Sequence, residues 1–185
     1  MRWDELFADL EAQASALARA ERGGEVDERT RGEVGTLALL DRLRAALGAP
    51  VRLHVLGGLT LAGAVSRVGP DWLLVDEQDG REAVVVLARV LRVRGLARYS
   101  AVPDSMSVVE SRLGLRHVLR GIARDRSATR VHLVDGTVLD ATLDRIGADF
   151  VEVAMHAPGE ARRRHEVREV EAVPLSAVAV VRRGV

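Results

Sequence analysis

The residues best suited to do chemistry are an arginine and a histidine that occur together twice. Arg52 and His54 are separated by one apolar residue, and Arg130 and His132 repeat that spacing. Alternate residues of a strand share a face, so each pair is predicted to lie on the outward face of a strand. Guanidinium groups bind phosphates in pairs of hydrogen bonds, and imidazoles stack on bases. These pairs are candidate nucleic-acid contacts; the alternative is a polar strand face that meets water or the preceding helix.

A compact basic cluster near the end of the chain is the second candidate. It consists of Arg162, Arg163 and Arg164, followed by His165. Such a cluster can touch nucleic acid through phosphates. Glutamates at 160, 166, 169 and 171 surround it, however, and the alternative is a solvated hairpin of mixed charge.

The segment 108–124 is similar to a helix-turn-helix core. Gly114 would lie at the turn, and the second helix would carry Arg116, His117, Arg120 and Arg124. The alternative is one helix that begins with a capping box formed by Ser107 and Glu110. DNA binding through this segment is therefore a third hypothesis.

Other chemistry finds no support in the sequence. The chain has no cysteine, which excludes disulfides, thiol catalysis and the usual structural zinc sites. It also lacks a glycine-rich phosphate loop, a serine elbow and a recognised metal-ligand spacing. We expect no enzyme activity, no cofactor, no metal and no small-molecule substrate.

The charge of the chain is balanced. The 185 residues include 27 basic residues, all of them arginine, and 27 acidic residues. Whole-chain electrostatics therefore gives no attraction to nucleic acid or to an anionic membrane, and any basic footprint must be local. Met1 to Leu10 carries acidic residues where a signal peptide needs an apolar core, and Ala83 to Leu87 is too short to span a bilayer. We expect a cytoplasmic protein without a membrane partner.

One stretch occurs twice and sets the expected architecture. Residues 54–75 align without a gap on residues 132–153, so that Gly58 matches Gly136 and Trp72 matches Phe150. Helical periodicity over 3–21 and 27–47 precedes the first copy. The predicted organisation is an N-terminal helical segment at 1–48 whose second helix caps a barrel at 49–96, a linker at 97–103, and a helix plus a second barrel at 104–185.

Apolar alternation predicts five short, sharply turned strands in each copy. Val51, Leu53 and Val55 begin the first set, and Val131 and Leu133 begin the second. Five such antiparallel strands after a helix are typical of a small barrel. The predicted fold class is α+β, with two tandem helix-plus-five-stranded barrels of the Sm-like or SH3 type behind the N-terminal helical segment.

The barrel pattern resembles the Sm-like superfamily, which includes the Sm and Lsm proteins and Hfq. The matching features are the LxDGxxL form at 133–139, Gly63 and Val65 in the second strand, and an aspartate, Asp71 or Asp149, that opens the third strand. The resemblance implies barrels that join edge to edge into rings or bind RNA. This chain has no asparagine, and its turns at 87–89 and 175–177 lack the Arg-Gly of the family, so the RNA-binding residues of the family are not transferred.

Three functional hypotheses follow. The first is a non-catalytic module for assembly or protein interaction, which acts through barrel edges and helices with a second copy or another protein as partner. The alternative is an RNA-binding regulator of the Sm or Hfq type that uses the Arg-x-His strands or the arginine cluster. The third is the DNA-binding regulator described above.

Overall fold

We describe the fold from a computed structural model, in which residues 35, 37–77, 80–97, 113–155 and 169–183 can be described. The chain divides into two compact units, Met1–Ala38 and Leu39–Val185. All of the helices and strands described below belong to the second unit. The helix predicted over residues 3–21 lies outside the described residues, as does most of the predicted linker at 97–103.

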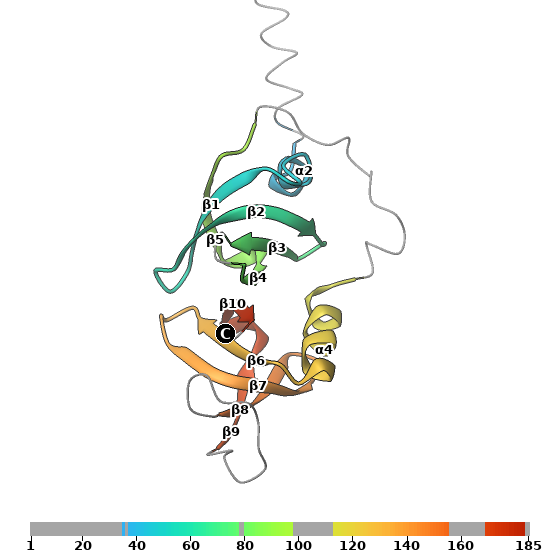
Figure 1. Cartoon of the computed structure of the whole chain (residues 1–185), viewed down its shortest axis with the longest axis vertical. Coiled ribbons are helices and arrows are strands. Elements are labelled where there is room, and N and C mark those ends of the chain that lie inside the picture. Colours follow the sequence, from blue (N-terminus) through green and yellow to red (C-terminus); the bar gives the residue numbers. More distant parts are fainter. Residues whose placement is uncertain (1–34, 36, 78–79, 98–112, 156–168, 184–185) are drawn as a thin grey trace, which may run out of the picture. The chain divides into compact units, whose positions relative to one another are not determined.

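The first half of this unit is a short helix followed by five strands (Figure 1). Its elements are α2 (Leu39–Arg44), β1 (Pro50–Val55), β2 (Thr60–Val68), β3 (Trp72–Glu77), β4 (Glu82–Val86), a 3₁₀ turn (Leu87–Arg89) and β5 (Val90–Arg94). Gly57 and Gly58, both with positive φ, make the tight turn from β1 to β2.

The second half repeats this order. Its elements are α4 (Leu115–Asp125), β6 (Ala128–Leu133), β7 (Val138–Ile146), β8 (Phe150–Met155), β9 (Val170–Pro174), a 3₁₀ turn (Leu175–Ala177) and β10 (Val178–Arg183). The repeat extends to strand register. Leu53 pairs with Leu61 as Val131 pairs with Leu139, and both long strands shift register near their ends, after Val65 and after Leu143.

The predicted fold class of two separate barrels in an α+β protein is wrong. The described strands form one ten-stranded sheet in the order β5-β1-β2-β3-β4-β10-β6-β7-β8-β9, and neighbouring strands in it are antiparallel. The last strand of the second half pairs with β4 of the first half, in the register Val180↔Val85 and Val181↔Val84. The fold is therefore dominated by a single sheet.

Burial of both faces of β4 and β10 explains this joining. Side chains from both strands are shared between two hydrophobic cores. One core receives Val84, Val86, Val178 and Val181, and the other receives Ala83, Val85, Ala179 and Val180. A strand with both faces buried has a continuous apolar run in place of alternation. The runs AVVV at 83–86 and VAVV at 178–181 have this form.

An ion pair also crosses the junction between β4 and β10. Nη2 of Arg182 on β10 donates to Oε1 of Glu77 at the end of β3, at 2.8 Å. The two side chains are only 17% and 12% exposed. Removing one partner of such a buried pair leaves an uncompensated charge, which costs several kcal/mol.

We predict that Glu77→Met and Arg182→Met each lower the free energy of unfolding by about 3 kcal/mol, because each leaves one buried charge unpaired. The double variant should lose less free energy of unfolding than either single variant, since neither of the two charges then remains at the site. Chemical denaturation of all four proteins measures this coupling. Additive losses in the double variant would mean that the pair does not stabilise the junction.

Candidate functional site

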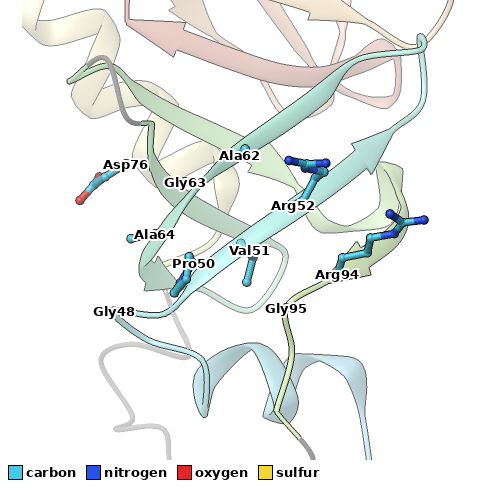
Figure 2. Close-up of a pocket in the computed structure, with 10 residues that line it drawn as sticks. All are labelled: Gly48, Pro50, Val51, Arg52, Ala62, Gly63, Ala64, Asp76, Arg94 and Gly95. Atoms are coloured by element: carbon cyan, nitrogen blue, oxygen red, sulfur yellow. The ribbon is translucent and has the colours of Figure 1, made fainter.

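Three arginines and a histidine form one exposed surface on β1 and the edge strand β5. Arg52 is the cross-strand partner of Arg94, and His54 is the partner of Arg92. The three arginines are exposed and His54 is half-buried. Figure 2 shows the Arg52 and Arg94 side chains on neighbouring strands. We call Arg52, His54, Arg92 and Arg94 the basic face.

The charges of the basic face are not compensated within the described part of the chain. No described carboxylate forms an ion pair with Arg52, Arg92 or Arg94. Like charges directly opposite one another on a sheet are destabilising. Asp76, which lines the same hollow, extends away from both arginines in Figure 2. A bound anion would therefore relieve the repulsion between Arg52 and Arg94.

His54 is held as a neutral hydrogen-bonding group. Nη2 of Arg92 lies 3.4 Å from its Nδ1, and the Thr60 hydroxyl lies 3.1 Å from the same atom. A guanidinium can only donate, so Nδ1 is the acceptor and Nε2 carries the proton. Desolvation lowers the pKa of His54 from its ordinary value, and the charges of Arg92, Arg94 and Arg52 lower it further. The ring can thus offer an Nε2–H donor at neutral pH.

A hollow of about 590 Å³ adjoins the basic face. Small residues and main chain make much of its lining, with Arg52 and Arg94 at one side (Figure 2). Gly63 is required in this region, because a Cβ there would clash with the main-chain carbonyl of Asp76. The volume lies in the range of pockets that hold small ligands or parts of larger ones.

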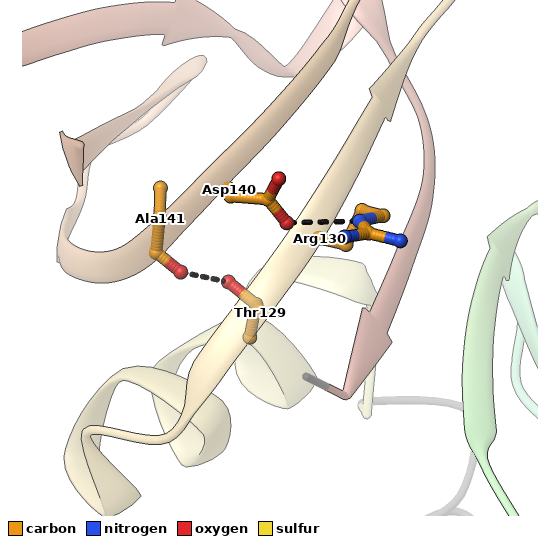
Figure 3. Close-up of polar contacts among 4 residues, drawn as sticks. All are labelled: Thr129, Arg130, Asp140 and Ala141. Atoms are coloured by element: carbon orange, nitrogen blue, oxygen red, sulfur yellow. Dashed lines mark hydrogen bonds and ion pairs between the residues drawn. The ribbon is translucent and has the colours of Figure 1, made fainter. Parts of the chain in front are cut away.

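The second Arg-x-His pair lies in a different environment. Arg130 pairs with Arg182 across β6 and β10, as Arg52 pairs with Arg94. Here each arginine has a carboxylate, because Nε of Arg130 donates to Asp140 at 2.8 Å and Arg182 donates to Glu77 at 2.8 Å. Figure 3 shows the Arg130–Asp140 pair beside the hydrogen bond from Thr129 to the Ala141 carbonyl. Within the described part of the chain, the duplicated sequence thus gives one uncompensated copy and one neutralised copy.

His132 in the neutralised copy is more strongly perturbed than His54. Burial lowers its pKa to about 4, with further lowering by Arg182 and Arg130 and partial opposition from Asp140. Its Nε2 is buried and has no hydrogen-bond partner among the described residues. The ring is therefore neutral at pH 7.

The remaining sequence candidates separate into two groups. Arg162, Arg163, Arg164 and His165 lie outside the described residues. Within 108–124, the described residues form the single helix α4, and Gly114 is its N-cap. Residues 108–112, which would supply the first helix of a helix-turn-helix, lie outside the described residues.

Sequence reasoning missed two members of the basic face. Arg92 and Arg94 alternate with apolar residues in the fifth strand, VLRVR, which was a usable signal. The pattern did not predict which strand pairs with this one. Only the pairing of β5 with β1 brings Arg94 opposite Arg52.

Comparison with known proteins adds no relative: no protein-family model, no curated protein and no solved structure matches this chain. The resemblance to the Sm-like superfamily stays a prediction. Among the described residues, no helix is long and apolar enough to cross a membrane.

The pKa of His132 predicts a pH dependence of stability. The unfolded chain binds a proton to this ring near pH 6.5, whereas the folded chain binds it only near pH 4. The stabilisation is complete above pH 6.5 and is lost as the pH falls through the window from 6.5 to 4. Between pH 7 and pH 5, the free energy of unfolding of the wild type should fall by about 1 kcal/mol more than that of His132→Leu, after allowance for solvent screening.

Denaturant titrations of both proteins across this range provide the measurement. The narrow window limits the contribution of carboxylates, most of which titrate below pH 5. Parallel pH profiles for wild type and variant would contradict the assignment.

Proposed function

We propose that the protein binds single-stranded RNA through the basic face. The observation that carries this proposal is the difference between the two copies. Arg130 and Arg182 each have a carboxylate partner, whereas the matching Arg52 and Arg94 have none among the described residues. The net charge of the chain is zero, so attraction to nucleic acid must come from a local basic patch. The arginine pair on β1 and β5 is such a patch.

The chemistry of the face suits a phosphate backbone. Three guanidinium groups provide charge-assisted hydrogen bonds to phosphate oxygens, and Nε2–H of His54 provides a neutral donor beside them. The adjoining hollow, lined by Gly63 and other small residues, leaves room for a sugar or base against the sheet. No phenylalanine, tyrosine or tryptophan among the described residues belongs to this surface, so we expect phosphate contacts to dominate and sequence preference to be weak.

The assembly hypothesis receives less support from the geometry, and it stays a prediction. If a second copy added its β9 edge to β5 as β4 adds to β10, Arg92 would occupy the place of the fully buried Val180. Met155 of the second copy would occupy the position that matches Glu77. The new contact would therefore lack an ion pair equivalent to the one between Glu77 and Arg182. Charged residues on an edge strand are a known protection against such pairing.

The proposal predicts a salt-dependent affinity for RNA. Three phosphate contacts on a single strand give a slope of about −2 for log K against log [salt]. The double variant Arg52→Gln/Arg94→Gln should retain a slope of about −0.7, because one phosphate contact remains. Fluorescence anisotropy with a labelled single-stranded RNA at several salt concentrations measures both slopes, and single-stranded DNA serves as a second probe.

Arg145→Gln is the matched control. Arg145 is 79% exposed on β7 and lies outside the basic face, so its loss should leave the slope at the wild-type value. Absence of RNA binding at low salt, or an equal loss in the control, would refute the proposal. A salt slope that stays at the wild-type value in the double variant would place the site elsewhere on the chain.

A further inference from the structure

A second cavity lies between α4 of the second half and the β2–β3 end of the first half. Its volume is about 660 Å³, which is within the range of small-molecule sites. It shares no residue with the basic face. Much of its wall is apolar, and the apolar lining residues are Leu47, Val68, Trp72, Leu74, Leu113 and Val118.

Hydrogen bonds between the halves hold the walls in place. Nε1 of Trp72 donates to the main-chain carbonyl of Leu113 at 2.6 Å. The main-chain N–H of Leu115, at the start of α4, donates to Oδ1 of Asp71 at 2.8 Å. These contacts tie the helix to the turn between β2 and β3. The cavity is therefore formed before any ligand arrives, which reduces the entropic cost of binding.

The polar side of the cavity is cationic. Arg67 from β2 faces three residues of α4, His117, Arg120 and Arg124, whose spacing of three and four places them on one side of the helix. No aspartate or glutamate belongs to the described lining. None of the four side chains has a hydrogen bond or an ion pair with another described residue. No described side chain therefore competes with a ligand for their donors.

We propose that this cavity binds a small amphiphilic anion, namely an organic carboxylate or phosphate monoester with an apolar tail. The head group would accept hydrogen bonds from Arg120 and Arg124, with Arg67 opposite, since planar guanidinium groups suit these oxygens. The tail would lie against Trp72 and Leu74. The arginines and the apolar wall together disfavour a bare inorganic ion, which has no tail, and a neutral hydrocarbon, which has no charged head group.

Isothermal titration with four compounds tests the chemistry. Octyl phosphate and octanoate, used below their aggregation concentrations, should bind, while inorganic phosphate and 1-octanol should bind at least tenfold more weakly because each lacks one feature. Vesicles of an anionic phospholipid test the other source of the same chemistry. Binding to vesicles without binding to the monomeric octyl compounds would overturn the small-ligand proposal.

Two variants locate the site. Arg120→Gln/Arg124→Gln should weaken octyl phosphate binding by tenfold or more while leaving octanol binding unchanged. Gly121→Leu should fill the cavity, because a Cβ at Gly121 meets no atom within 4 Å. This change replaces a glycine inside a helix, so it should raise helix stability, and loss of binding would not result from unfolding.

Arg116→Gln is the control, because Arg116 is exposed on the same helix but does not line the cavity. It should bind octyl phosphate with wild-type affinity. Unchanged binding in Gly121→Leu would overturn the proposal. The proposal would also be overturned if Arg120→Gln/Arg124→Gln weakened binding of duplex DNA but not of octyl phosphate. That result would favour a DNA-binding role for α4.

Discussion

The structure depends on one main-chain ladder, the pairing of β4 with β10. Both strands bury side chains on both faces, so each contributes to the two cores at once. Neither half forms a separate barrel, because β4 of the first half and β10 of the second half pair with each other inside one sheet. The same constraint sets the outer limits of the sheet, where β5 and β9 remain as edges. These edges carry Arg92, Arg94 and Glu171, in contrast to the apolar runs at the junction.

The junction also explains why duplicated residues have different roles. Arg182 lies on the buried strand β10 and meets Glu77 across the junction, and Arg130 beside it meets Asp140 on β7. Arg94 lies on an edge strand and forms no ion pair with a described carboxylate, and the position that matches Asp140 is Ala62. One difference in charge, Ala62 in place of Asp140, and one difference in pairing thus distinguish the exposed basic face from the structural pair of arginines.

Much of the local structure could be predicted from the sequence, and the long-range pairing could not. The residue pattern predicted five strands in each copy, and alternation predicted the outward position of Arg52. Strand periodicity describes one strand at a time, so it does not reveal whether β10 pairs with a strand of its own half or of the other. The continuous apolar runs at 83–86 and 178–181 did carry that information, since only a strand buried on both faces needs them. Arg92 and Arg94 joined the site only through the pairing of β5 with β1, which is also long-range.

The most direct test of this account gives the first copy the carboxylate of the second. Ala62 is exposed and lies opposite Arg52, as Asp140 lies opposite Arg130. Ala62→Asp should pair with Arg52 and lower the affinity for single-stranded RNA about tenfold at low salt without loss of stability, since neutralising a phosphate-binding arginine removes its contact. Ala62→Asn, which has the same shape without the charge, should bind as the wild type does. An RNA affinity that is equal in Ala62→Asp and Ala62→Asn would contradict the account.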